Sequence, residues 1–231
     1  MTAAGRDERD EALSALTAPV EDYLKAIYEI ERGGGSAGTT DIAQRLAIAP
    51  ASVSGMVRRL ADAGLLAHER YRGVRLTEAG RRAALRTLRR HRVIEAYLAR
   101  ALGYPWDRVH AEAERLEHAA SDELIDRMAA AIGEPTEDPH GAPIPTRDGL
   151  VDERPLRSVA DLAVGERATV RRVSDDDAGR LRYLADQGIV IGAELQLVGR
   201  APYGGPLAIR VGRATRQLGP VLAAQILVDA G

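Results

Sequence analysis

The chain has 231 residues, of which 45% are hydrophobic and 29% are charged. This composition is typical of a globular protein with one or two compact cores, and it excludes a disordered or fibrous chain. Because cysteine is absent, disulfides, iron–sulfur clusters and thiolate zinc sites are excluded, and any metal must be held by histidine, carboxylate, methionine or carbonyl groups.

Charge is distributed unevenly along the sequence. The net charge is −2, yet residues 44–100 contain thirteen arginines and four acidic residues, a local balance of +9 that leaves −11 for the remainder. A basic block of this kind attracts DNA phosphates, although the same arginines are also compatible with a solvated helix face. We find no secretory signal and no apolar stretch long enough to span a bilayer, so we expect a cytoplasmic protein.

The first third of the sequence predicts a winged helix-turn-helix. Helices are predicted over residues 20–31, 41–46 and 51–63, and a β-hairpin with a charged tip over residues 65–76. Thr39 or Thr40 is expected to cap the first of the two short helices. Two helices, a tight turn and a hairpin wing form a DNA-binding unit.

The rest of the sequence predicts a helical region followed by a small β domain. A long helix is predicted from Glu78 to about Leu102. Pro105 and Asp107 are predicted to open a second helix, and Ser121 to cap a third that ends at Gly133. The proline-rich, acidic segment 134–155 indicates an ordered arm or linker. Strands are predicted over residues 168–173, 194–198 and 207–211, with a helix over residues 180–186. We therefore expect a mostly α protein with a small β domain, divided at residues 1–76, 77–149 and 150–231.

The N-terminal part of the second short helix is predicted to enter the major groove. Its small residues favour readout of DNA shape and of thymine methyl groups, while nearby arginines suit phosphate contacts. We expect the DNA-binding residues to be Thr39, Thr40, Ala51, Ser52, Ser54, Gly55, Arg58, Arg59, Arg70 and Arg72. A winged helix that binds protein, or that merely packs, is the alternative.

Histidines and carboxylates recur at helical spacing in the middle of the chain. Four of them fall on one face of a single helix: His110, Glu114, Glu117 and His118. His91 and Glu95 lie one turn apart on the preceding helix. Nitrogen and oxygen ligands without sulfur suit Mn²⁺ or Fe²⁺, and Zn²⁺ or Co²⁺ could substitute. Exposed His–Glu pairs produce the same pattern without a metal, so the spacing alone leaves both interpretations open.

The sequence resembles the diphtheria toxin repressor family of metal-dependent transcriptional regulators, and within it the manganese-transport regulators. The resemblance rests on the motifs EDYLKAIY at 21–28, LTEAG at 76–80, RHR at 90–92, VHAEAERLEH at 109–118 and DPHGAPIP at 138–145. It covers nearly the whole chain, because the C-terminal β domain resembles the SH3-like domain of that family. It implies a homodimer that binds operator DNA and represses metal-uptake genes.

The resemblance also implies two metal sites. The first would be formed by Asp22, Glu114, Glu117 and His118. The second would be formed by His91, Glu95 and His110, completed by the SH3-like domain through Asp176 and Asp177.

Two positions bear on which metal is bound. Iron regulators of the family carry Cys and Met where this chain has Glu114 and Asp22, and the change from sulfur to oxygen favours Mn²⁺. Lys25 stands where some manganese regulators have a Glu ligand, so their closely spaced two-metal cluster is not expected. We expect a manganese-dependent repressor, with an iron-dependent repressor as the alternative.

Functions of other classes are less well supported by the residues. A metal-free winged-helix regulator of an organic ligand has the same DNA-binding pattern. A metallohydrolase could use Glu117 beside a metal-bound water, but no nucleophile motif, phosphate loop or HExxH pair accompanies it, so we expect no enzyme. A peptide-binding SH3-like adaptor would need an aromatic groove, and after Trp106 only Tyr183 and Tyr203 remain.

Overall fold

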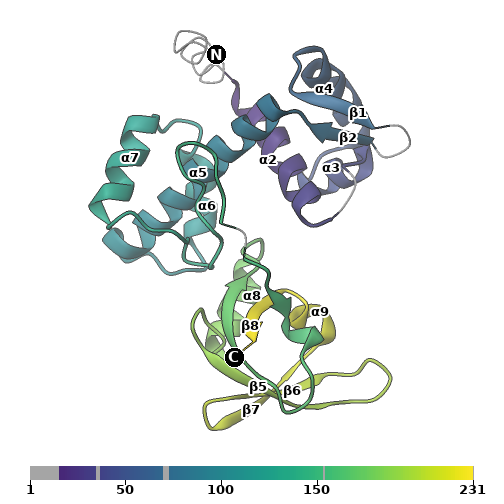
Figure 1. Cartoon of the computed structure of the whole chain (residues 1–231), viewed down its shortest axis with the longest axis vertical. Coiled ribbons are helices and arrows are strands. Elements are labelled where there is room, and N and C mark those ends of the chain that lie inside the picture. Colours follow the sequence, from purple (N-terminus) through teal and green to yellow (C-terminus); the bar gives the residue numbers. More distant parts are fainter. Residues whose placement is uncertain (1–15, 35–36, 70–72, 153, 231) are drawn as a thin grey trace. The chain divides into compact units, whose positions relative to one another are not determined.

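The computed structural model describes residues 16–34, 37–69, 73–152 and 154–230 (Figure 1). These residues form two compact units. The first unit contains the described residues up to Arg90 together with 117–119 and 145–150, and the second contains 91–116, 120–144 and the chain from 151 onward.

A winged helix-turn-helix forms most of the first unit, as the sequence predicts. Its elements are α2 (Ala18–Arg32), α3 (Thr39–Arg45), α4 (Pro50–Asp62), β1 (Leu66–Glu69) and β2 (Gly73–Leu76). The apolar stripes of the helices meet at fully buried side chains such as Leu24, Ile42 and Val53. The two strands pair antiparallel, with Leu66 opposite Leu76.

The start of α3 differs from the prediction. The N-cap is Gly38, and Thr39 and Thr40 lie inside the helix rather than before it. Asp41 Oδ2 accepts a hydrogen bond from the Gly38 amide at 3.3 Å, so the carboxylate of the first turn satisfies a backbone donor there.

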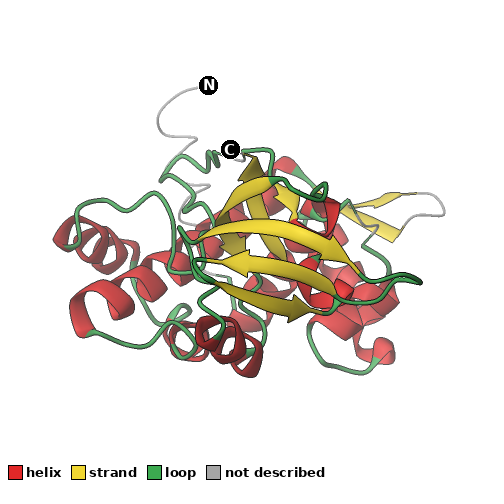
Figure 2. Ribbon diagram, turned by 90° about the horizontal axis from the view of Figure 1, so that it is seen from below, coloured by secondary structure: helices red, strands yellow, loops and turns green. Residues whose placement is uncertain are grey.

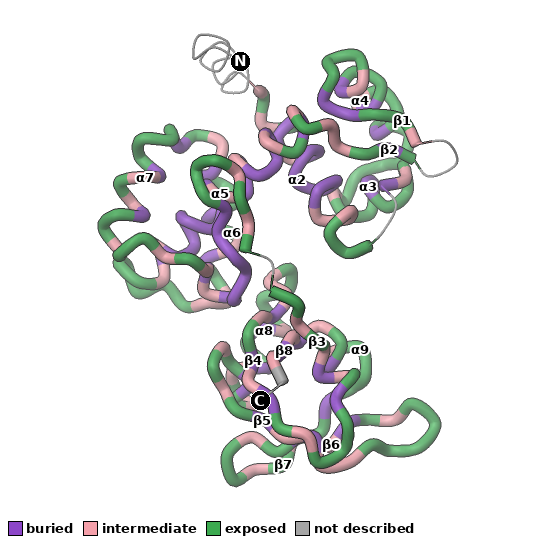
Figure 3. Tube along the Cα trace, in the orientation of Figure 1, coloured by how far each residue is buried: buried purple, intermediate pink, exposed green. Residues whose placement is uncertain are grey.

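Three helices form the α-helical region: α5 (Glu78–Leu102), α6 (Val109–Leu116) and α7 (Asp122–Ala131). The bounds of α5 are those predicted, and Ser121 caps α7, since its hydroxyl accepts from the Leu124 amide at 3.2 Å. In the second unit, buried residues of all three helices share one core. Purple marks buried residues along the tube in Figure 3. Helix α6 ends at Leu116, so Glu117 and His118 lie beyond it and do not continue its face as predicted.

The proline-rich arm is tightly packed over residues 138–145. Residues 140–145 are buried, and the amide of Val173 donates to the carbonyl of His140 at 3.0 Å, which joins the arm to β4. Gly141 has φ +82°, and a Cβ at this position would lie 1.8 Å from the carbonyl oxygen of Arg171. Only glycine permits so close an approach of the two backbones.

The C-terminal region is a six-stranded antiparallel sheet with short helices, drawn in yellow and red in Figure 2. Its elements are β3 (Arg157–Ser158), η1 (Val159–Asp161), β4 (Arg167–Val173), α8 (Ala178–Asp186), β5 (Glu194–Arg200), β6 (Leu207–Val211), β7 (Ala214–Leu218), α9 (Pro220–Ala223) and β8 (Ile226–Ala230). The strand order is β3-β8-β4-β5-β6-β7, and a separate apolar core lies among these elements. The predicted strands and the predicted helix are all present, and β3, β7 and β8 are additional.

None of the described helices is both long enough and apolar enough to cross a membrane.

Candidate metal centres

A first cluster of potential ligands is formed by Asp22, Glu117 and His118. His118 Nε2 lies 2.9 Å from Asp22 Oδ1 and 3.4 Å from Glu117 Oε1. The three ligand atoms lie within 4.8 Å of one another. Two carboxylates and one imidazole are a suitable ligand set for a divalent ion.

The orientation of His118 is set by a residue that the sequence prediction missed. Glu21, one position before Asp22, accepts from His118 Nδ1 at 2.7 Å, and its other oxygen accepts from Arg90 at 3.0 Å. Because a carboxylate accepts, Nδ1 carries the proton and the Nε2 lone pair faces the first cluster. A carboxylate behind a histidine ligand fixes its tautomer in many metal sites.

Lys25 contributes a cation to the first cluster. Its ammonium lies 2.6 Å from Glu117 Oε1, and the side chains of Lys25 and Glu117 are 11% and 0% exposed. A buried carboxylate of the first cluster is therefore already paired with a positive charge.

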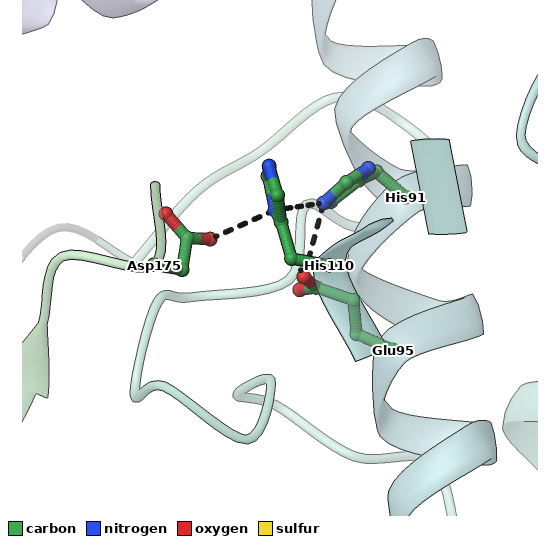
Figure 4. Close-up of side chains that lie close together, drawn as sticks. All are labelled: His91, Glu95, His110 and Asp175. Atoms are coloured by element: carbon green, nitrogen blue, oxygen red, sulfur yellow. Dashed lines mark hydrogen bonds and ion pairs between the residues drawn. The ribbon is translucent and has the colours of Figure 1, made fainter. Parts of the chain in front are cut away.

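A second cluster comprises His91 and Glu95 on α5, His110 on α6 and Asp175, which follows β4 (Figure 4). His91 Nε2 lies 3.1 Å from His110 Nδ1 and 3.1 Å from Glu95 Oε1. His110 Nδ1 lies 3.3 Å from Glu95 Oε1 and 3.6 Å from Asp175 Oδ2. Two imidazoles and two carboxylates from three parts of the second unit converge on one point.

The electrostatics of the second cluster favour a cation. Burial lowers the pKa of His110, but its hydrogen bonds to Asp175 and Glu95 outweigh burial and raise that pKa to about 10. Burial raises the pKa of Glu95, but His91 and His110 outweigh it and lower that pKa to about 2. Despite burial, His110 likewise holds the pKa of Asp175 below its usual value. Without a metal, the cluster therefore binds a proton.

Unsatisfied polar atoms in and beside the second cluster also fit a cation. Glu95 Oε2 and His140 Nδ1 are buried and have no hydrogen-bond partner in the described part of the chain. Burying such atoms without a partner is costly, and a coordinated ion satisfies them. The residues present therefore fit a divalent metal ion.

Three predicted ligands have contacts other than those expected. Glu114 Oε1 lies 3.6 Å from His91 Nδ1 and 3.9 Å from His110 Nε2, so its carboxylate borders the second cluster. Asp177 caps α8 by accepting from the Arg180 amide at 2.9 Å, and Asp176 accepts from the Arg180 side chain at 2.7 Å. Local contacts therefore occupy both carboxylates, and Asp175, rather than Asp176 or Asp177, lies beside His110.

The surface predicted to bind DNA is exposed on the first unit. Thr39 and Thr40 of α3 are exposed, as are the candidate residues on α4, namely Ala51, Ser52, Ser54, Gly55, Arg58 and Arg59. Val53, Val57 and Leu60 form the opposite, buried face of α4. Arg70 and Arg72 lie outside the described residues.

The basic block does not consist of DNA-facing residues alone. Arg90 is buried and pairs with Glu21 at 3.0 Å. Arg92 is also buried, with Nε 3.6 Å from Asp138 Oδ2 and a hydrogen bond of 2.6 Å to the Pro143 carbonyl. These two arginines are structural, so part of the local charge excess is neutralised inside the protein.

Comparison with known proteins identifies the family. Models of the iron dependent repressor N-terminal DNA binding domain and of its metal binding and dimerisation domain match residues 15–74 and 77–146, and a FeoA domain model matches 157–230. The iron-dependent repressor IdeR of Mycobacterium tuberculosis is 32% identical over 232 residues, which covers 94% of this chain and 99% of IdeR. The chain belongs to the iron-dependent repressor family.

Other members of the iron-dependent repressor family resemble this chain over different shares of its length. A solved manganese-dependent transcriptional repressor in complex with manganese is 40% identical, with a TM-score of 0.87 over 92% of this chain and 100% of the other. The HTH-type transcriptional regulator MntR of Lysinibacillus sphaericus is 36% identical over 123 residues, 53% of this chain and 88% of MntR. The predicted fold class and the expectation of a metal-dependent transcriptional repressor, and not an enzyme, are confirmed by these matches.

Proposed function

We propose that this chain is a manganese-dependent repressor in which Mn²⁺ bound at the first cluster organises a homodimer for operator DNA. The observation that carries the proposal is the origin of the ligands. Asp22 lies on α2, the first helix of the winged helix-turn-helix, whereas Glu117 and His118 come from the segment after α6. An ion held by α2 and by the segment after α6 would fix the orientation of α2 and of α4, the helix predicted to enter the major groove. In a dimer, that orientation would set the spacing of the two DNA half-sites.

The donor atoms support Mn²⁺ as the activating ion. The first cluster offers carboxylate oxygens and one imidazole nitrogen without sulfur, which suits a hard divalent ion. The similar solved repressor that contains manganese supports the same choice, while the similarity to IdeR favours Fe²⁺ as the alternative. Affinity at such sites runs lower for Mn²⁺ than for Fe²⁺ or Zn²⁺, so selectivity must come from geometry and cellular supply.

The proposal has a thermodynamic requirement. Mn²⁺ must bind the DNA-competent conformation more tightly than the alternative, and operator DNA must raise the affinity for Mn²⁺ by the same factor.

The test is a titration of operator DNA with metal-stripped, full-length protein at fixed salt, using the promoter of a neighbouring manganese-uptake gene. Added Mn²⁺ should tighten binding at least tenfold, about 1.4 kcal/mol, and a chelator should reverse it. Fe²⁺ in the absence of oxygen, Zn²⁺ and Co²⁺ are compared in parallel, and sedimentation of the complex measures the dimer. Equal binding with chelator would refute the proposal.

One variant isolates the first cluster. Asp22→Ala should remove the dependence of operator binding on Mn²⁺, because the ligand from α2 is lost. Asp152→Ala is the matched control, since Asp152 is exposed and pairs only loosely with Arg154 at 3.5 Å. Unchanged metal dependence in Asp22→Ala would show that the ion does not act through α2.

A further inference from the structure

We propose that the second cluster is one half of a dinuclear metal centre, in which two divalent ions share the carboxylates of Glu95 and Asp175. The further ligands are His91 and His110 for one ion, and Asp138 and His140 for the other. The proposal rests on the proposed metal-dependent function, but it concerns how many ions are bound and not whether they control DNA binding.

Two overlapping ligand sets carry the proposal. Glu95 and Asp175 complete a set of four with the two histidines of the second cluster, and a second set of four with Asp138 and His140. Within each set the four ligand atoms lie within 4.8 Å of one another. A carboxylate has two oxygens and can bridge two ions, which in dinuclear sites lie about 3.5–4 Å apart.

His140 is prepared for a metal by its other ring nitrogen. Nε2 lies 2.7 Å from the Trp106 carbonyl oxygen, which only accepts, so Nε2 carries the proton and Nδ1 has a free lone pair. The ring also stacks on Trp106 with centroids 5.9 Å apart, and its side chain is 1% exposed. Nδ1 lies 3.8 Å from Glu95 Oε1 and 3.8 Å from Asp175 Oδ2 and makes no hydrogen bond in the described part of the chain. A lone pair facing two carboxylates is unfavourable unless a cation lies between them.

Asp138 is held in place by one oxygen and offers the other. Oδ1 accepts from the amides of His140 at 2.8 Å and Ala142 at 3.0 Å, within its own loop. Oδ2 is buried without a hydrogen bond among the described residues, and Arg92 Nε lies 3.6 Å from it. Because Oδ1 is held by the two amides, the side chain is fixed and Oδ2 is available to bind a cation.

Glu95 has an oxygen available for each ion. Oε1 lies 3.1 Å from His91 Nε2 and 3.3 Å from His110 Nδ1, which assigns it to the first ion. Oε2 is buried and has no hydrogen bond in the part of the chain that the structure describes. A single ion on the histidine side would leave Oε2, Asp138 Oδ2 and His140 Nδ1 unsatisfied, whereas a second ion accounts for all three atoms.

The experiment counts ions in the full-length chain after the first cluster has been disabled by Asp22→Ala combined with His118→Ala. Equilibrium dialysis with Mn²⁺ should give two bound ions per chain. Low-temperature electron paramagnetic resonance should show an exchange-coupled Mn²⁺ pair in place of the six-line signal of isolated ions. One bound ion, or two ions without coupling, would overturn the proposal.

Variants within that background assign the second ion. Asp138→Asn keeps the shape of the side chain, and His140→Gln removes the imidazole; each should reduce the count to one ion and restore the six-line signal. His68→Gln, at an exposed position of β1, is the control and should retain the coupled pair. Circular dichroism checks folding, and Asp138→Asn keeps the test valid if His140→Gln does not fold. Two coupled ions in Asp138→Asn would contradict the assignment.

The outcome is independent of the operator titration. Mn²⁺ without effect on operator binding, together with two coupled ions, would refute the proposed function and support the dinuclear centre. Metal-dependent operator binding with a single ion in the second cluster would support the function and refute the centre.

Discussion

The Lys25 ammonium forms a buried salt bridge with Glu117, 2.6 Å from its Oε1 atom, within the first cluster. Glu117 is thus a potential metal ligand whose charge is partly neutralised by the protein itself. A bound ion must share this carboxylate with the ammonium. The pair therefore keeps the metal-free first cluster stable while it lowers the negative charge offered to the metal.

Replacing Lys25 by Gln should destabilise the metal-free protein by about 3 kcal/mol, because the buried carboxylate of Glu117 loses the ammonium that lies 2.6 Å from it. Mn²⁺ should then raise the melting temperature more than it does in the unmodified protein, since the ion becomes the principal cation at Glu117. Thermal unfolding with and without Mn²⁺ measures both effects.

The matched control is Arg45→Gln, which breaks the ion pair between Arg45 and Glu29 on a more exposed surface. An exposed pair contributes about 1 kcal/mol or less, so the melting temperature should change little and the effect of Mn²⁺ not at all. If Lys25→Gln without metal melts like the unmodified protein, the salt bridge does not stabilise the first cluster.

Metal binding at the second cluster should release protons. Since the pKa of His110 is raised to about 10, its imidazole is protonated at pH 7 and must lose a proton before it can bind an ion. We expect about one proton per chain to be released there at pH 7, and Mn²⁺ affinity to rise about tenfold per pH unit below the pKa of His110. Calorimetric titration in two buffers of different ionisation enthalpy measures the proton count.

A second group steepens this dependence at lower pH. Burial and the charge of Glu95 raise the pKa of Asp138 to about 6, against the opposing effect of Arg92. Below pH 6 the affinity should therefore fall with a slope approaching two protons. In His110→Gln the release at pH 7 should be lost; the same proton count in that variant would exclude His110 as the source.

The helices were predictable because their signals are local. Glu78 and Leu102 bound α5 as predicted, and the hydroxyl of Ser121 caps α7 as its position before two acidic residues indicates. Strand β7 was missed, because Ala214–Leu218 has few of the β-branched residues that mark strands and is held by pairing with β6. This pairing, which places Val211 opposite Ala214 across a tight turn, is not revealed by composition.

The residue types of the candidate ligands were predictable from the sequence, but their positions were less so. Three consecutive aspartates, 175–177, have the same chemistry, and only the capping of α8 and the contacts of Arg180 show that Asp175 alone faces His110. Regular helical spacing also suggested that Glu114 and His118 share a face, but α6 ends at Leu116. Helix ends are the least predictable part of such a pattern because tertiary contacts decide them.

Arg58 on α4 should contribute a DNA phosphate contact. Arg58→Ala is expected to weaken operator binding at saturating Mn²⁺ and to reduce the slope of log affinity against log salt by about 0.9, the value for one lost phosphate contact. Binding titrations at several salt concentrations measure the slope. Arg127→Ala, an exposed position on α7 paired with Glu123, should leave the slope unchanged. An unaltered slope in Arg58→Ala would place this residue away from the DNA backbone.

Gly141 should be required for the second cluster, because Asp138 and His140 lie on the loop that it allows to approach β4. Gly141 and Gly133 share a φ of +82°, but an added Cβ meets the Arg171 carbonyl at 1.8 Å only in the first case and nothing within 4 Å in the second. Gly133→Ala should therefore show the cost of the left-handed backbone alone, about 1–2 kcal/mol. Gly141→Ala should cost more and should also weaken Mn²⁺ binding at the second cluster at least tenfold, because the clash displaces the loop from β4. Chemical denaturation of the metal-free proteins and Mn²⁺ dialysis measure the two effects. Equal stability and equal Mn²⁺ affinity of the two variants would show that the contact with Arg171 does not position the ligands of the loop.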